Sequence, residues 1–217
     1  MSQEAAATPD ALAPHSAEAH AEHHDPVACK LGMWLFLFSE VLLFGTLFIA
    51  FAVYMSMYHF DFADGSRQLN RLIGATNTVI LLTSSLTMAL AIAAMERSKR
   101  RLSLGLMAVT VLMGLSFMAI KGYEWHHKFE NDLYPKSPTM LAKPFGQQVF
   151  FGLYYTMTGL HALHVIIGCA VILSAMVLVA RGRVHAGRIS YIENTGLYWH
   201  LVDLIWILLF PLYYLMG

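Results

Sequence analysis

Residues 144–180 read PFGQQVFFGLYYTMTGLHALHVIIGCAVILSAMVLVA and contain no Asp, Glu, Lys or Arg. A helix needs about 20 apolar residues to cross roughly 30 Å of hydrocarbon, so this stretch is longer than one membrane span requires. Its apolar residues follow one another without the alternation that marks a barrel strand. Because only helices and closed barrels satisfy their backbone inside lipid, the stretch predicts a transmembrane helix that tilts or extends beyond the bilayer.

Four further stretches are almost as free of charge. The chain has 217 residues, of which 57% are hydrophobic and 13% charged, whereas about a quarter of a soluble domain is charged. This composition excludes a disordered chain, a nucleic-acid binder with a basic face, and most soluble enzymes. The sequence therefore predicts an all-α fold, a polytopic membrane helix bundle with five transmembrane helices near residues 31–55, 72–95, 102–123, 148–176 and 192–215.

The first 28 residues differ from the rest of the chain. They are rich in Ala and His and contain no Lys or Arg, since the first basic residue is Lys30. A signal peptide needs a basic start and an adjoining apolar run, so we expect the first helix to insert without cleavage. We expect a flexible, solvated His/Ala-rich tail at residues 1–28 and a five-helix membrane domain at residues 29–217.

Basic residues between the predicted helices indicate the orientation of the chain. The short connections 96–101 and 181–191 carry Lys and Arg at high density, whereas the longer segment 121–145 mixes them with Glu and Asp. Cytoplasmic loops of membrane proteins carry the excess of Lys and Arg. We therefore expect the N-terminus on the cytoplasmic side and the C-terminus on the outer side.

Ionisable residues inside the predicted helices are the candidate functional residues, because each costs about 2.5–3.5 kcal/mol at a helix centre. They are Glu40, His161, His164, His200 and Asp203. His161 and His164 share one helix face, as do His200 and Asp203, and we expect these faces to look toward protein. Interhelical hydrogen bonds or proton exchange would suit them. Glu40 has no basic residue within two turns of its own helix, so a lipid headgroup, a partner subunit or a water chain is its candidate contact.

Two imidazoles on facing helices could instead hold a b-type haem. In the expected orientation His200 lies in the inner third of the membrane and His164 nearer its centre, and this difference in depth argues against a shared haem. The adjacent His126 and His127 point in different directions on a helix, so they predict no metal site. The sequence has no P-loop, dinucleotide-binding turn, nucleophile motif or zinc spacing, and we predict no catalytic residue and no metal site in this chain.

The sequence resembles subunit III of the haem–copper oxidases. Residues 32–44, GMWLFLFSEVLLF, are similar to the first-helix motif of the family's five-helix forms. Residues 158–168, TGLHALHVIIG, and 198–206, YWHLVDLIW, are similar to the motifs of its last two helices. The resemblance covers about residues 26–217. Mitochondrial-type members have seven helices, and the first two have no counterpart here.

The resemblance implies an accessory, cofactor-free subunit of a cytochrome c oxidase in the bacterial plasma membrane. In the family, subunit III packs on the catalytic subunit I beside subunit II, and those partners hold the haems and copper. It supports proton uptake, oxygen access through bound phospholipids, and stability during turnover, with cytochrome c as the donor to the complex. Glu40 matches the family's carbodiimide-reactive carboxylate. Arg181, Arg183 and Arg188 are candidate contacts for lipid headgroups, because an Arg fork suits phosphate.

Other functions remain open at this point. The same fold serves in quinol oxidases and in a small protein associated with nitric oxide reductase, and residues 209–213, LFPLY, resemble the latter. Glu rather than Asp at position 40 favours the cytochrome c type. A haem-b membrane anchor of a dehydrogenase is the alternative from another class, and it would require His164 or His200 as an iron ligand.

Overall fold

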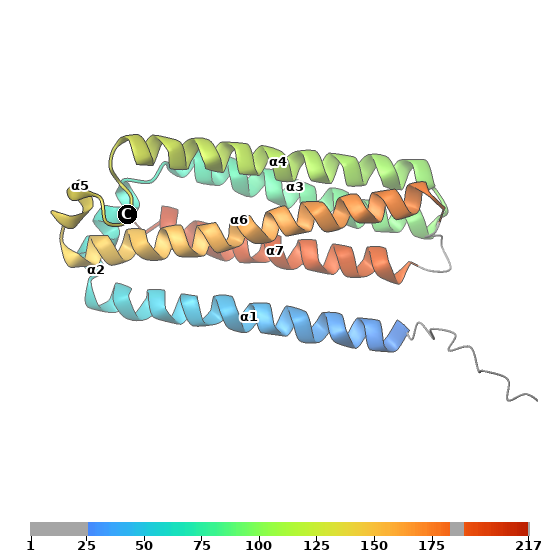
Figure 1. Cartoon of the computed structure of the whole chain (residues 1–217), viewed down its shortest axis with the longest axis horizontal. Coiled ribbons are helices and arrows are strands. Elements are labelled where there is room, and N and C mark those ends of the chain that lie inside the picture. Colours follow the sequence, from blue (N-terminus) through green and yellow to red (C-terminus); the bar gives the residue numbers. More distant parts are fainter. Residues whose placement is uncertain (1–25, 183–188, 217) are drawn as a thin grey trace, which may run out of the picture.

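The computed structural model describes residues 26–182 and 189–216, which form helices and no strand (Figure 1). Five of these helices are long and apolar enough to cross a membrane, which confirms the predicted all-α bundle. They are α1 (Pro26–Met57), α3 (Arg71–Glu96), α4 (Arg100–Glu130), α6 (Phe145–Ala180) and α7 (Ser190–Tyr214). Two short helices that we did not predict lie in the connections, namely α2 (His59–Arg67) and α5 (Pro138–Leu141).

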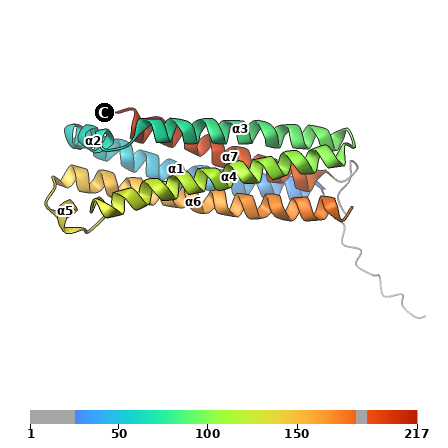
Figure 2. The same cartoon turned by 90° about the horizontal axis from the view of Figure 1, so that it is seen from above.

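Four of the long helices form a bundle, and the fifth lies along its side. α3 packs against α4 and α7, and α6 packs against the same two helices. α1 contacts α6 and α7 and runs parallel to the long axis of the bundle (Figures 1 and 2). The helices α2 and α5 and the C-terminus lie at one end, which we call the α2 end. The α3–α4 connection and the C-terminal end of α6 lie at the opposite end.

The predicted helices differ from the observed ones mainly at their ends. The largest difference is in α4, which we expected to end at residue 123 and which continues to Glu130. In this last part Lys121, Glu124 and Lys128 turn inward and expose only 1%, 4% and 5% of their surface. Glu124 and Lys128 lie beyond the predicted end of the helix, and partners on other helices allow α4 to continue through them. Of the predicted tail, residues 1–25 lie outside the described residues, and α1 begins at Pro26.

A single tryptophan joins the four helices of the bundle. Trp199 of α7 is fully buried, and its indole N–H donates to Ser84 Oγ of α3 at 3.1 Å. A Cβ atom added to Gly114 of α4 or to Gly168 of α6 would lie 2.8 Å from the Trp199 ring. The ring therefore fits only because both neighbouring helices lack a side chain at the contact, which is how small residues allow close packing in membranes.

α1 is the most exposed of the long helices. Within its residues 30–57 only Leu37, Phe44 and Phe51 are buried, and their spacing of seven residues forms one narrow stripe against the bundle. The rest of its surface carries exposed apolar side chains, including Trp34 and Phe38. This face is suited to lipid or to another membrane subunit.

Gly168→Ala is expected to destabilise the protein by about 1–3 kcal/mol, because the new methyl group overlaps the Trp199 ring in a packed core. Gly152→Ala is the matched control on the same helix, since a Cβ there meets nothing within 4 Å. The thermal unfolding midpoint of each purified variant in detergent measures the difference. Equal midpoints for the two variants would contradict the role assigned to Gly168.

Candidate functional site

Glu40 of α1 and His164 of α6 form a hydrogen-bonded pair across the interface between α1 and the bundle. Glu40 Oε2 lies 2.8 Å from His164 Nε2. The other ring nitrogen, His164 Nδ1, lies 2.7 Å from the carbonyl oxygen of Leu160, one turn earlier on α6. The two side chains are 13% and 9% exposed. Glu40, which has no basic partner on its own helix, therefore finds one on a helix far away in the sequence.

The hydrogen bonds of this pair define its protonation states. A carbonyl oxygen only accepts, so His164 Nδ1 must carry a proton and donate it to Leu160. The contact between Nε2 and Glu40 then needs one further proton, which sits either on the Glu40 carboxyl or on the imidazole. The pair thus holds one shared proton, and its net charge is zero in both arrangements. It can gain or lose that proton only through groups outside the pair.

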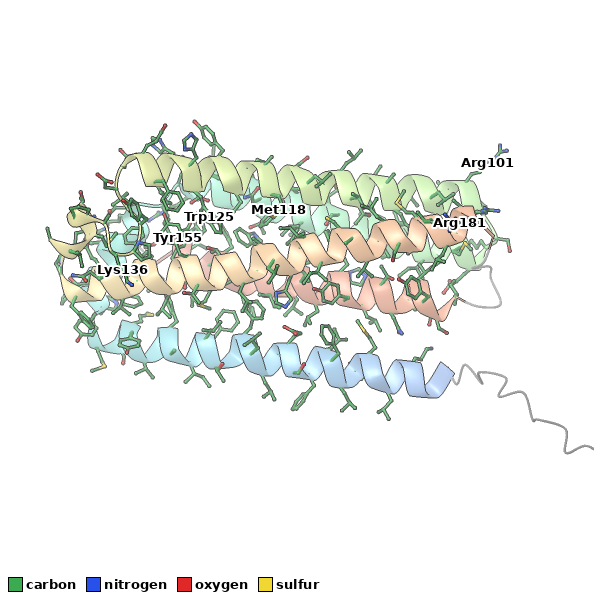
Figure 3. All side chains as sticks on the ribbon, in the orientation of Figure 1. Arg101, Met118, Trp125, Lys136, Tyr155 and Arg181 are labelled. Atoms are coloured by element: carbon green, nitrogen blue, oxygen red, sulfur yellow. The ribbon has the colours of Figure 1, made fainter. Side chains whose placement is uncertain are left out.

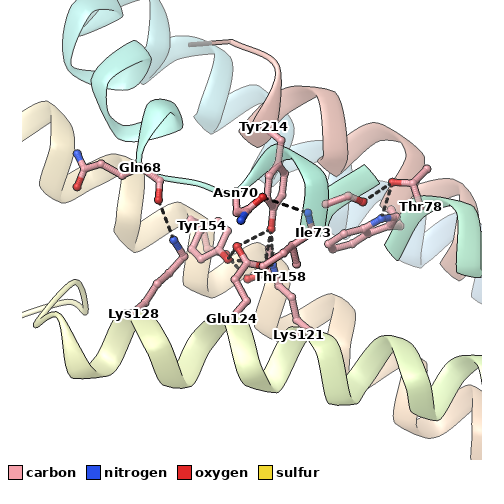
Figure 4. Close-up of polar contacts among 12 residues, drawn as sticks. Gln68, Asn70, Ile73, Thr78, Lys121, Glu124, Lys128, Tyr154, Thr158 and Tyr214 are labelled. Carbon is pink, nitrogen blue, oxygen red and sulfur yellow. Dashed lines mark hydrogen bonds and ion pairs between the residues drawn. The ribbon is translucent and has the colours of Figure 1, made fainter. Parts of the chain in front are cut away.

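A second polar group, which we call the Lys121 cluster, lies inside the bundle at the α2 end (Figure 4). It consists of Lys121 and Glu124 of α4, Tyr154 of α6 and Tyr214 of α7. Lys121 Nζ donates to Glu124 Oε2 at 3.0 Å, to Tyr154 Oη at 2.9 Å and to Tyr214 Oη at 2.8 Å. Both tyrosine hydroxyls donate in turn to the Glu124 carboxylate, at 3.1 Å and 2.8 Å for the shortest contacts. All three ammonium donors and both carboxylate oxygens are satisfied, so the buried ion pair is fully compensated.

Sequence reasoning missed this cluster. Lys121 and Glu124 lie directly after a charge-free stretch and three residues apart, which places them on one face of a continuing helix. That spacing was the available signal. The tyrosines carried none, because their partners come from α6 and α7 and only the folded bundle brings them together.

Gln68, in the connection between α2 and α3, accepts hydrogen bonds from two lysines at the same end of the bundle. Its carbonyl oxygen accepts from Lys128 Nζ at 3.3 Å, and its side-chain Oε1 accepts from Lys143 Nζ at 2.6 Å. Partial burial lowers the pKa of Lys143. This end therefore contains a high density of ammonium groups for a membrane helix bundle.

His200 and His161 are placed differently by the structure. His200 Nδ1 of α7 lies 2.6 Å from Ser85 Oγ of α3, so this half-buried histidine makes an interhelical hydrogen bond. His161 is fully buried between the rings of Phe117 and Trp206, with centroid distances of 5.5 Å and 5.2 Å. Among the described residues neither of its ring nitrogens has a hydrogen-bond partner. His161 therefore packs as an aromatic ring and lacks the interhelical hydrogen bond that we expected.

Asp203 is also buried, with 2% of its surface exposed. Neither of its carboxylate oxygens has a hydrogen-bond partner in the described part of the chain. His200 and Asp203 share a helix face, but the hydrogen bond of His200 goes to Ser85 and not to Asp203.

No group of three or more His, Cys, Asp and Glu side chains that could hold a metal ion occurs in residues 26–182 and 189–216. Both ring nitrogens of His164 are engaged, one by Leu160 and the other by Glu40. In this arrangement His164 has no free lone pair for a haem iron.

Comparison with known proteins identifies the family of this chain. A family model described as "Cytochrome c oxidase subunit III" matches residues 15–217. The chain belongs to the cytochrome c oxidase subunit III family. It is therefore a subunit III-type component of a haem–copper oxidase complex and a multi-pass membrane protein.

Relatives of this subunit III occur in more than one kind of oxidase. The cytochrome c oxidase subunit 3 of Synechocystis is 33% identical over 201 residues, which are 92% of this chain and 80% of the relative. The cytochrome bo(3) ubiquinol oxidase subunit 3 of Pseudomonas putida is 31% identical over 194 residues, or 86% and 85% of the two chains. The heme-copper oxidase subunit I+III of Aeropyrum pernix is 30% identical over 198 residues, which are 86% of this chain and 22% of that longer protein.

The candidate headgroup contacts of this subunit III lie away from both polar sites. Arg181 is exposed after the C-terminal end of α6, at the same end of the bundle as Arg101 (Figure 3). Arg100 donates a hydrogen bond to the Ala180 carbonyl oxygen there, which ties the start of α4 to the end of α6. Arg183 and Arg188 lie outside the described residues.

Lys121→Met is expected to destabilise subunit III by about 3–5 kcal/mol, because it leaves the Glu124 carboxylate buried without its counter-ion. The double variant Lys121→Met/Glu124→Gln removes both charges and should recover most of that loss. Thermal unfolding of the detergent-solubilised protein measures both effects. If the double variant were as unstable as the single one, an unpaired buried charge would not be the cause.

Proposed function

We propose that this subunit III is a non-catalytic subunit of a cytochrome c-oxidising complex and packs directly on the catalytic subunit I. The observation that carries the proposal is the paired, one-proton site of Glu40 and His164 beside the thinly packed α1. It is an ionisable pair at the edge of the chain. Such a site can influence proton movement in a neighbouring subunit without taking part in oxygen chemistry.

The exposed surface of α1 supports an arrangement beside another membrane subunit. α1 buries one stripe of three residues, and most of its remaining surface is apolar and exposed. In the Aeropyrum pernix relative, subunits I and III are named as parts of one chain. A fused protein keeps its two parts close, so the same neighbours are expected for the separate chain. The haems and copper of the complex would then lie in subunits I and II.

Cytochrome c is the donor that we favour, and a quinol is the second candidate. The Synechocystis relative is named as part of a cytochrome c oxidase, and Glu occupies position 40 rather than Asp. The Pseudomonas putida relative, named as part of a ubiquinol oxidase, is almost as similar and supports the quinol alternative. Co-purification of the complex from its native membrane, followed by its haem spectrum and its activity with each donor, distinguishes the two.

The orientation and the lipid contacts follow from the distribution of charge. We place the N-terminus in the cytoplasm of a bacterial cell and the C-terminus on the outer side of its plasma membrane. The connection after α6 then lies on the cytoplasmic side, and we propose its residues Arg181, Arg183 and Arg188 as contacts for phospholipid phosphates, which suit Arg guanidinium groups. Glu40, through its shared proton with His164, serves proton movement, and His200 serves helix packing through Ser85.

Glu40→Gln is expected to leave assembly largely intact, because an amide N–H can still donate to His164 Nε2. Glu40→Lys should lower the amount of subunit III in the complex several-fold, since His164 cannot compensate an ammonium group at this partly buried position. The ratio of subunit III to subunit I in the purified complex measures the effect. Equal ratios for the two variants would contradict the proposed pairing.

Deletion of the whole subunit is expected to slow proton uptake by the oxidase complex or to reduce the number of turnovers that the complex completes before inactivation. The haem spectrum of subunit I should stay unchanged, because this chain is proposed to hold no cofactor. Stopped-flow proton uptake and progress curves of oxygen consumption measure the first effect, and visible spectroscopy measures the second. A lost haem signal would show that the chain carries or secures a cofactor.

A further inference from the structure

A cavity of about 330 Å³ opens at the α2 end of the bundle, between the α2–α3 connection and the last turns of α4. We call it the Lys128 cavity. Its polar lining comes from Arg67, Gln68 and Asn70 on one side and from Tyr123, Glu124, His127 and Lys128 on the other. Figure 4 shows the hydrogen bond from Lys128 to Gln68 that links the two sides. The Glu40–His164 pair is not part of this cavity.

Lys128 is a buried cation of this cavity that has no ion-pair partner among the described residues. Only 5% of its surface is exposed, and its ammonium makes one hydrogen bond, to the Gln68 carbonyl oxygen at 3.3 Å. No carboxylate of the described residues lies within 4.0 Å of Lys128 Nζ. Glu124 lines the same cavity, but Lys121 and two tyrosines already occupy both of its oxygens. A buried ammonium without a counter-ion is costly, so its remaining donors call for an anion.

Arg67 is a second cationic residue that lines the cavity. The Arg67 side chain is 67% exposed, and its one ion pair is a contact of 3.3 Å with Asp64 in the same short helix. Most of its guanidinium donors therefore remain available. Arg67 and Lys128 come from different elements and line one space, and the Glu124 charge there is balanced by Lys121. The cavity therefore has an excess of positive charge. An Arg guanidinium can bind phosphate through two parallel hydrogen bonds, and a Lys ammonium can donate a further one.

The depth of the cavity suits a phospholipid headgroup. The charge-free residues 102–120 of α4 span about 28 Å, close to the hydrocarbon thickness of roughly 30 Å. The headgroup layer is about 5–7.5 Å thick on each side of the hydrocarbon. Tyr123 lies about 4.5 Å and Lys128 about 12 Å beyond the charge-free stretch on the same helix, so the cavity extends outward from the headgroup layer. Tyr123, which lines the cavity, is 68% exposed and offers the interfacial aromatic surface typical of this level.

We propose that the Lys128 cavity binds a phosphate-bearing anion between Lys128 and Arg67, with the headgroup of an anionic phospholipid as its source. The phosphate would accept from the buried Lys128 ammonium and from the Arg67 fork. The bound anion would thereby stabilise the contact between the α2–α3 connection and α4. This inference does not depend on the electron donor or on the Glu40–His164 pair.

The test is a binding titration of the intact, delipidated complex that contains this subunit, followed by native mass spectrometry. The probes are dioleoyl-phosphatidylglycerol in detergent and, in a separate arm, inorganic phosphate. Lys128→Met is expected to weaken phosphatidylglycerol binding at one site by about tenfold or more, because a charge-assisted hydrogen bond is lost. Arg67→Gln, which changes only an exposed side chain, should weaken it as well. Lys136→Met is the control, since it removes an exposed lysine outside the cavity.

Each outcome decides the proposal. Loss of one lipid site in Lys128→Met and Arg67→Gln, with retention in Lys136→Met and Lys128→Arg, supports a phospholipid at this cavity. If inorganic phosphate binding is lost in Lys128→Met while phosphatidylglycerol binding is equal in all variants, the anion site stands and its source is free phosphate. Equal binding of both probes by all variants overturns the proposal. If Lys128→Met does not assemble, the comparison of Arg67→Gln with Lys136→Met gives the same decision.

Discussion

The cost of an uncompensated charge inside a membrane bundle is the constraint on which the rest of this structure depends. Water cannot solvate a side chain there, so each ionisable group needs a partner from the protein, from a ligand or from another subunit. Two pairs of ionisable residues meet this requirement in different ways. Glu40 and His164 share one proton and have a net charge of zero as a pair, whereas Lys121 and Glu124 form an ion pair within a closed set of hydrogen bonds.

These two arrangements suit different tasks. The Lys121 cluster has no free donor or acceptor, so it holds α4, α6 and α7 together and resists change. The Glu40–His164 pair lies at the loosely packed α1 and has two proton positions of equal net charge. A site of that kind can respond to a neighbouring subunit at little electrostatic cost. Subunit III thus has a fully hydrogen-bonded cluster at one end of the bundle and a proton-sharing pair at its side. This combination is suited to an accessory subunit.

The close approach of the helices allows these polar contacts to form. Trp199 sits against Gly114 and Gly168, and its indole reaches Ser84 across the bundle. At this spacing His200 also reaches Ser85 of α3. Polar bonds between membrane helices are individually weak, about 0.6 kcal/mol on average, so they select one register more than they drive association. Packing of small residues against aromatic rings supplies the contact area.

The sequence by itself determined the number of transmembrane helices, their approximate positions and the family, because absence of charge over about 20 residues is a local property that lipid requires. It also identified Glu40 and the histidines as unusual. Only the tertiary structure decided their partners. Glu40 and His164 are 124 positions apart, and Lys121 meets Tyr214 from 93 positions away. Such pairs depend on helix rotation and depth, which one-dimensional spacing does not contain. The packing of His161 between two aromatic rings and the continuation of α4 to Glu130 likewise depend on contacts between helices.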